Sequence, residues 1–90
     1  MTDYVIMNNI VCQNTGSLAP GSNTTVYGDV VIPQGYKLIG ASPRYSGDDQ
    51  FAFINCYAEA STSRVYATVQ NVSSSADSGS PQVFAILIKT

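Results

Sequence analysis

Apolar residues along this 90-residue chain gather in short runs, and clusters of Gly, Pro, Asn, Asp and Ser separate the runs. No window keeps a 3.6-residue apolar period over about eleven positions, so no amphipathic helix is indicated. The runs are rich in Val, Ile, Thr, Tyr and Phe, a composition that favours strands. Six extended segments are therefore predicted: Asp3–Gln13, Asn23–Ile32, Tyr36–Tyr45, Gln50–Ala58, Ser63–Asn71 and Gln82–Thr90.

Short strands at this spacing predict an all-β antiparallel sandwich, jelly-roll-like or barrel-like, with about six to eight strands and no significant helix. A chain of this length makes one domain, covering residues 1–90. Pro33-Gln34-Gly35 predicts a tight turn that closes a hairpin. Gly28 predicts a bulge or a close backbone approach, and Pro43 predicts a strand edge or exit. The polar stretch 72–82 is predicted to be a plain, mobile hairpin loop.

Several predicted strands are apolar on both faces. The fifth alternates cleanly, with Val65, Ala67 and Val69 opposite polar residues, as a half-buried strand does. In the fourth, Phe51 and Phe53 are predicted on one face, opposite Ala52, Ile54, Cys56 and Ala58 on the other. The first and last predicted strands also carry apolar residues on both faces.

A two-layer sandwich covers the inner faces of its strands and leaves the outer faces bare. Other copies of the chain are the expected cover, because most oligomers are homo-oligomers. The alternatives are closure into a barrel, a loop that hides one face, or contact with the rest of a longer parent chain. The predicted subunit contacts are Val5, Met7, Phe51, Phe53, Phe84, Ile86 and Ile88.

Charge is scarce in this chain. Charged residues make up 11% of it, against roughly 25% in average soluble domains. The four basic residues are spread along the sequence and the net charge is −2, whereas phosphate binding needs clustered Lys and Arg. Nucleic acid and membranes are therefore not expected partners. The N-terminus lacks the pattern of a signal peptide, which predicts a protein made in the cytoplasm or a fragment of a longer one.

The sequence offers no recognisable catalytic arrangement. There is no His, so neither a Ser-His-Asp nor a Cys-His arrangement can form. Cys12 and Cys56 lack zinc-ligand spacing, and they are either two buried thiols or a disulfide of an oxidising compartment. The adjacent acids Asp48 and Asp49 fit a solvated turn. The chain is predicted to be no enzyme and to use no cofactor or metal.

One segment carries the side chains that sugar-binding proteins use. Of the six tyrosines, Tyr45 is singled out as exposed, because it adjoins a polar loop. An aromatic ring beside Arg, Asp and Gln can stack on a sugar and hydrogen-bond it. A lectin-like carbohydrate-binding module of a secreted or cell-wall protein is therefore one functional hypothesis. Its predicted ligand-binding residues are Arg44, Tyr45, Asp48, Asp49 and Gln50.

Four stretches carry a family resemblance: "VIPQGYKLIGASPRY", "FAFINCYAEAS", "RVYATVQNVSSS" and "VFAILIKT". Together they resemble the small C-terminal β-domains of bacteriophage tail and fibre proteins, over roughly residues 24–90. The shared features are the Pro33-x-Gly35-Tyr36 turn followed by Ile39-Gly40, and the closing apolar strand that ends in Lys89. Ile86 or Leu87 stands where such domains carry Tyr.

This resemblance implies a non-catalytic structural protein of the phage virion that forms a homotrimer. It also implies contacts with other virion proteins and with a host receptor, such as a surface glycan. A virion protein is assembled in the host cytoplasm and needs no signal peptide.

Overall fold

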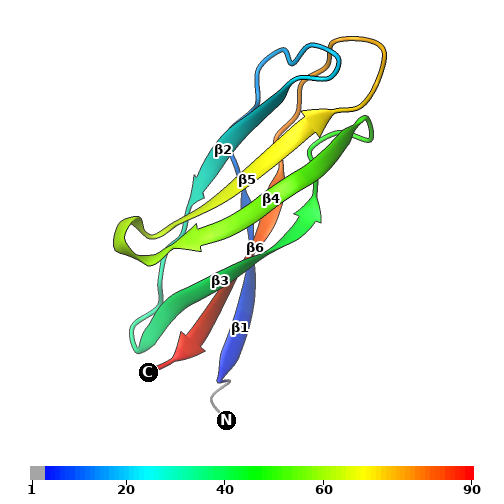
Figure 1. Ribbon diagram of the computed structural model, residues 1–90. Helices are drawn as coiled ribbons and strands as arrows, with labels where there is room; N and C mark the ends of the chain where they lie inside the picture. The colour runs from blue at the N-terminus through cyan, green and yellow to red at the C-terminus, as the bar shows by residue number, and fades with distance from the viewer. Residues whose placement is uncertain (1–3) are drawn as a thin grey trace.

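The computed structural model describes residues 4–90 and consists of six strands joined by loops (Figure 1). A three-residue 3-10 helix, Ala60–Thr62, lies between the fourth and fifth strands. All four strand pairings are antiparallel. The strands are β1 (Val5–Val11), β2 (Asn23–Asp29), β3 (Tyr36–Tyr45), β4 (Phe51–Glu59), β5 (Arg64–Asn71) and β6 (Gln82–Lys89).

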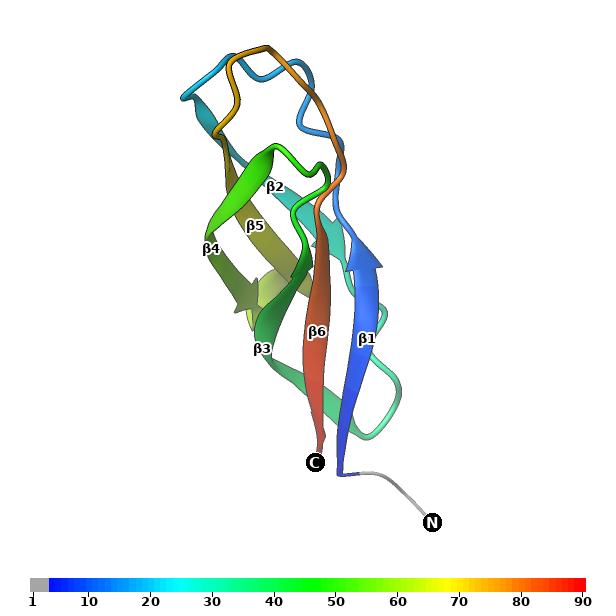
Figure 2. The same cartoon turned by 90° about the vertical axis from the view of Figure 1, so that its right-hand side faces the viewer.

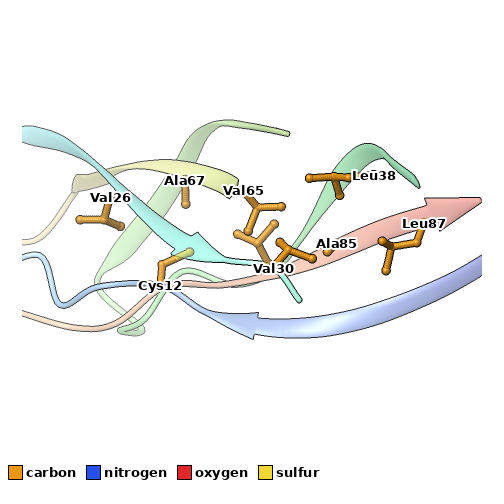
Figure 3. Close-up of a cluster of buried hydrophobic side chains, with 9 residues drawn as sticks. Cys12, Val26, Val30, Leu38, Val65, Ala67, Ala85 and Leu87 are labelled. Atoms are coloured by element: carbon orange, nitrogen blue, oxygen red, sulfur yellow. The ribbon is translucent and has the colours of Figure 1, made fainter. Parts of the chain in front are cut away.

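The strands form two three-stranded sheets, with the orders β1–β6–β3 and β2–β5–β4. Figure 2 shows the first sheet in front of the second. Apolar residues from both sheets meet between them in the core, part of which is drawn in Figure 3. The predicted fold class, an antiparallel all-β sandwich without significant helix, is confirmed.

The central strand of each sheet supplies most of the fully buried side chains. In β5 and β6 every second residue is buried and its neighbours are partly exposed. Full burial of a Val or Leu side chain stabilises the fold by about 1.5–3 kcal/mol relative to exposure. The two central strands therefore hold the sheets together. The apolar side chains with no exposed surface are Val65, Ala67, Val69, Val83, Ala85 and Leu87.

The predicted hairpin between the second and third strands is wrong, because β2 and β3 belong to different sheets. The connection 30–35 crosses from one layer to the other, with Val30 buried in the core and Val31 exposed. The tight turn itself is present. The N–H of Tyr36 donates to the carbonyl of Pro33 at 3.1 Å, and Gly35 has the positive φ of 86° that a type II turn needs at this position.

A β-bulge overturns the predicted faces of β4. Its register with β5 shifts between Phe53 and Asn55, so one extra residue, Ile54, is inserted. Strict alternation resumes one residue out of step after the bulge. Phe53 and Cys56 consequently pack against the same core, and Ile54 is exposed. Ala58 likewise turns to the core, so Cys56 and Ala58 share the face of Phe53 and do not lie opposite it.

Gly28 permits a close approach of β2 to the end of β1, the second of its two predicted roles. The register of β2 with β5 runs without a shift, so no bulge is present. A methyl group on Gly28 would overlap the Ile10 side chain and lie 3.3 Å from the Val11 carbonyl oxygen. The missing side chain lets the two sheets meet at this edge of the sandwich.

The Ser-rich stretch 72–81 differs from the predicted plain hairpin loop. It joins β5 of one sheet to β6 of the other and is bonded to the segment 15–18. Leu18 and Asp77 form an isolated antiparallel bridge, and the N–H of Thr15 donates to the Gly79 carbonyl at 2.8 Å. Asn71, which has no exposed surface, forms hydrogen bonds to both segments.

The loop 46–50 is also fixed to this end of the molecule. Gly47 has a positive φ of 97°, and its backbone lies against Gly79 so closely that a methyl group on either residue would overlap the other loop. Three connections therefore meet at one end of the sandwich, opposite the chain termini in Figure 1.

Candidate functional site

The outer face of the β1–β6–β3 sheet presents a group of apolar side chains to solvent. It is called the apolar face below. On β1, Val5 and Met7 are each 51% exposed and Val11 is 59% exposed. On β6 the outward side chains are partly exposed. The residues of the apolar face are Val5, Met7, Val11, Ile39, Phe84, Ile86 and Ile88.

Sheet register explains how these side chains come together. Val5 lies opposite Ile88 and Met7 opposite Ile86, so their outward side chains form a row across β1 and β6. On the other side of β6, Ile86 lies opposite Gly40, where a methyl group would touch the Ile86 side chain at 3.8 Å. The absent side chain at Gly40 leaves Ile86 uncovered on that side.

Polar groups bound the apolar face at the end nearest the loops. The Asn9 amide donates to the Gln82 side-chain oxygen at 3.3 Å, and Arg44 donates to the same oxygen. Lys37, opposite Ile88 in register, is the charged residue at the other end. Most of the apolar face thus lies between polar groups at its two ends, as in protein–protein interfaces, whereas Val11 lies beyond Asn9, opposite Gln82.

The predicted subunit contacts divide into two groups in the structure. Five of the residues lie on the apolar face: Val5, Met7, Phe84, Ile86 and Ile88. Phe51 and Phe53 do not, because they point between the sheets. Phe51 is 6% exposed and packs with Leu18 and Val69, and Phe53 contacts both buried clusters. Strand alternation correctly predicts that both residues lie on one face of β4, but that face is the inner one.

The predicted sugar-binding segment is largely bonded to itself. The Asp48 carboxylate accepts the N–H of Gln50 at 2.8 Å, and the Tyr45 hydroxyl donates to Asp49 at 3.3 Å. Arg44 turns away from this loop to Gln82 on β6. Partial burial first, and then the negative charge of Asp49, raise the pKa of Tyr45. These groups hold the turn together, and the structure gives them no common ligand pocket.

Tyr45 is exposed, as predicted, at 40%, and Tyr57 at 42% and Tyr4 at 77% are exposed as well.

A row of tyrosines crosses the outer face of the β2–β5–β4 sheet. Tyr66 lies between Tyr27 and Tyr57 in register. Its ring stacks on Tyr57 at 4.8 Å between centroids, with 10° between the planes, and the Tyr27 ring is tilted at 6.0 Å. The Arg64 guanidinium lies 4.0 Å from the Tyr27 centroid, and its Nε donates to Asp29 at 3.1 Å.

Charged groups lie along one side of the tyrosine row, because Glu59, Arg64 and Asp29 face one another in register in the neighbouring row of the sheet. Glu59 accepts hydrogen bonds from the Tyr66 hydroxyl at 3.4 Å and from Thr62 at 2.7 Å. The outward positions of Tyr27, Tyr57 and Tyr66 on three predicted strands were the available signal for this row. Recognising it also needed the order and register of those strands.

Cys12 and Cys56 are free thiols in the core. Desolvation, followed by the proximity of Cys56, raises the pKa of Cys12 to about 11. Desolvation also raises the pKa of Cys56. Both thiols stay protonated near neutral pH and are poor nucleophiles, so the buried-thiol alternative describes this structure.

Within residues 4–90, no group of three or more His, Cys, Asp or Glu side chains could hold a metal ion, and no pocket is found. No helix among the described residues is both long enough and apolar enough to cross a membrane.

Comparison with known proteins gives no match: no protein family, no curated protein and no solved structure matches the chain at a significant level.

Proposed function

We propose that the chain is a non-catalytic structural domain of a bacteriophage virion appendage, which associates with copies of itself as a homotrimer through the apolar face. The observation that carries the proposal is the apolar face itself, seven outward apolar side chains on one sheet. The four most exposed of them leave on the order of 400 Å² of apolar surface in water, the size at which patches on monomers are often functional. Burying that area would gain about 10 kcal/mol at about 25 cal/mol per Å².

The virion role and the threefold symmetry come from the resemblance to phage tail and fibre domains. The low charge and the neutral polar surface suit a protein that is assembled in the host cytoplasm and then exposed on a particle. The partners in this proposal are other copies of the chain, neighbouring virion proteins and a host receptor.

The molar mass of two matched variants tests the assembly. Ile86→Asp places a charge at the centre of the apolar face, and Thr68→Asp places one at a half-exposed, outward position on the central strand of the other sheet. Light scattering after gel filtration should give a reduced number of subunits for Ile86→Asp and the wild-type number for Thr68→Asp. Circular dichroism confirms that both variants are folded. Equal masses for wild type and Ile86→Asp would contradict the proposal.

The phage origin has a separate test in the genes that flank the coding sequence. Neighbouring tail, capsid or lysis genes would support a virion protein. A neighbourhood of metabolic genes would contradict it.

A second function, carbohydrate binding, is favoured by the tyrosine row. Tyr57 offers a ring that is 42% exposed, and Glu59 and Arg64 supply charged hydrogen-bonding groups nearby. Aromatic faces beside such groups are suited to sugars. A glycan array should detect binding by wild type and weaker binding by Tyr57→Ala. Tyr45→Ala, at the sugar-binding segment predicted from the sequence, is the matched variant. Loss of binding in Tyr45→Ala but not in Tyr57→Ala would place the site at that segment instead.

A further inference from the structure

The strand β1 has an unpaired backbone edge. It is the outer strand of its sheet and pairs with β6 alone. The N–H of Lys89 donates to the Tyr4 carbonyl, and the N–H of Cys12 donates to the Pro81 carbonyl, both at 2.8 Å. In an antiparallel pair every second residue bonds to the partner. Because Tyr4 and Cys12 bond to β6 or its approach, the even-numbered residues of β1 face that strand.

The odd-numbered residues of β1 therefore direct their backbone N–H and C=O groups away from β6. These residues are Val5, Met7, Asn9 and Val11. Among residues 4–90, no backbone hydrogen bond joins these outward N–H and C=O groups to another strand. The row ends at Gln13, whose N–H donates to the Tyr27 carbonyl of β2 at 3.0 Å. The free edge of β1 thus runs from Val5 to Asn9. At Val11 the strand β2 lies alongside, because a methyl group on Gly28 would be 3.3 Å from the Val11 carbonyl oxygen.

The other outer strands carry features that discourage pairing with a further strand, and β1 does not. Charged residues, Pro and bulges protect exposed edges in natural sheets. β3 contains Pro43 and two register shifts, β4 contains the bulge at Ile54, and β2 ends in Asp29. The segment Val5–Val11 has no charge, no Pro, no Gly and no register shift against β6.

The sequence of β1, VIMNNIV, is nearly symmetric about Asn8. When two copies run antiparallel with Asn8 opposite Asn8, Val5 meets Val11 and Ile6 meets Ile10. This is also the one register in which the two seven-residue strands overlap completely. The two central pairs, in which Met7 of one copy faces Asn9 of the other, can each exchange two backbone hydrogen bonds and would form about four. Val11 contributes none, because β2 lies beside it.

We propose that β1 pairs with β1 of a second copy of this chain across a twofold axis at Asn8, which joins two β1–β6–β3 sheets into one six-stranded sheet. Such a contact is self-complementary, as twofold interfaces are. It brings no like charges together, because β1 is uncharged. It uses the strand edge and not the apolar face, so it is an additional contact beyond the proposed trimer. Together the two contacts would give six subunits, the edge alone two and the face alone three.

Replacement of Asn9 by Pro tests this pairing. Pro removes an N–H that points away from β6 and leaves the β1–β6 hydrogen bonds in place, a situation in which edge strands tolerate Pro. Asn9→Ala is the matched control, because both variants lose the side-chain bond to Gln82. We expect Asn9→Pro to halve the number of subunits relative to Asn9→Ala. Equal masses of the two folded variants would overturn the edge pairing.

Comparison of Asn9→Pro with Ile86→Asp separates this inference from the proposed function. If the apolar face alone associates, Ile86→Asp lowers the mass and Asn9→Pro does not. If the edge alone associates, the reverse holds, and the trimer proposal fails while the pairing at β1 stands.

Hydrogen exchange of the wild-type protein gives a readout that requires no substitution. The amides of Met7 and Asn9 should exchange slowly when β1 is paired, and faster on dilution as the pair dissociates. A trimer formed through side chains of the apolar face leaves these two amides open to water. Exchange at the rate of an unstructured peptide, independent of concentration, would contradict the proposal.

The register has its own test in a cysteine variant. Asn8→Cys places two thiols directly opposite each other at the twofold axis, and should form an intermolecular disulfide under mild oxidation. Val11→Cys is the control, because its two thiols would lie near opposite ends of the pairing. The wild type, which keeps Cys12 and Cys56, sets the background. Equal cross-linking of Asn8→Cys and Val11→Cys would overturn this register.

Discussion

Replacement of Asn71 by Ala should unfold the protein at much lower temperature than replacement of any exposed polar residue. Asn71 has no exposed surface and fills its whole hydrogen-bonding capacity of two donors and two accepted bonds. Its amide nitrogen donates to the carbonyls of Leu18 at 2.8 Å and Ser75 at 2.9 Å. Its oxygen accepts the N–H of Ser73 at 2.9 Å and the Ser73 hydroxyl at 2.7 Å.

The size of the loss follows from these four bonds. A typical hydrogen bond contributes about 1 kcal/mol net, and a buried group left without a partner costs about 1–3 kcal/mol. Ser73 and Ser75 lie near the surface and can bind water in the variant, whereas Leu18 is 7% exposed and its surroundings cannot adapt as easily. We expect Asn71→Ala to lower the free energy of unfolding by about 3 kcal/mol, which is roughly 12–24 °C in Tm for a domain of this size.

Thermal unfolding followed by circular dichroism measures this difference. Gln70→Ala is the matched control, because Gln70 is the preceding residue, is partly exposed and makes one side-chain bond, to the Gly21 carbonyl at 3.0 Å. All proteins must be compared at one concentration, since self-association shifts Tm. If the free energies of unfolding of Asn71→Ala and Gln70→Ala differ by less than about 1 kcal/mol, the size of one hydrogen bond, the central role given to Asn71 is refuted.

Asn71→Asp adds a test of the same reasoning through pH. The variant keeps the shape of the side chain but loses both donors and aims a carboxylate at two carbonyl oxygens. Burial raises the pKa of such a carboxyl, so the variant should be least stable above that pKa. It should recover stability, relative to wild type, as pH falls and the group is protonated.

Three further predictions concern the close contacts and the buried thiol. Gly28→Ala should lower the free energy of unfolding by about 1–3 kcal/mol, measured by urea, because the added methyl overlaps Ile10; an unchanged midpoint would show that the sheets can separate there freely. Gly79→Ala should lower Tm further than Gly28→Ala, because the methyl meets the Gly47 backbone and not a movable side chain; the opposite order would contradict the contact between these loops. Raising the pH from about 9 to about 11 should destabilise wild type relative to Cys12→Ala by up to about 2–3 kcal/mol. The reason is that the Cys12 thiol ionises first in the unfolded chain, because its pKa in the folded protein is raised to about 11. Urea midpoints of the two proteins that change in parallel across this pH range would refute the raised pKa.

The strands were predictable because each one combines β-branched or aromatic composition with a turn signal at both ends. β3 has the predicted bounds, Tyr36–Tyr45, and β5 differs from its prediction by one residue at its start. Burial in β5 and β6 follows simple alternation, since neither strand carries an inserted residue of its own. Local composition and spacing therefore sufficed for the fold class.

The errors arose where local patterns depend on distant partners. The bulge at Ile54 is visible only against β5, and without it the inward side chains of β4 after Phe53 are assigned to the wrong face. A tight turn at Gly35 shows that the chain reverses, but not that it also changes sheets. The tyrosine row depends in the same way on sheet order, because Tyr27, Tyr57 and Tyr66 become neighbours through register alone.

The predicted subunit contacts on β1 and β6 lie on the outer face because both strands alternate regularly. The hydrogen bonds of Asn71 could not be anticipated, since its partners lie in two loops that composition describes simply as polar.

Sedimentation equilibrium of the wild-type chain is the most direct test of the central claim, that the outer surface of the β1–β6–β3 sheet is covered by other copies. One subunit has a mass of 9.6 kDa. We expect a mass of two or more subunits at micromolar concentration, falling towards one subunit when both Ile86→Asp and Asn9→Pro are introduced. A mass of 9.6 kDa for the folded wild type at every concentration measured would contradict it.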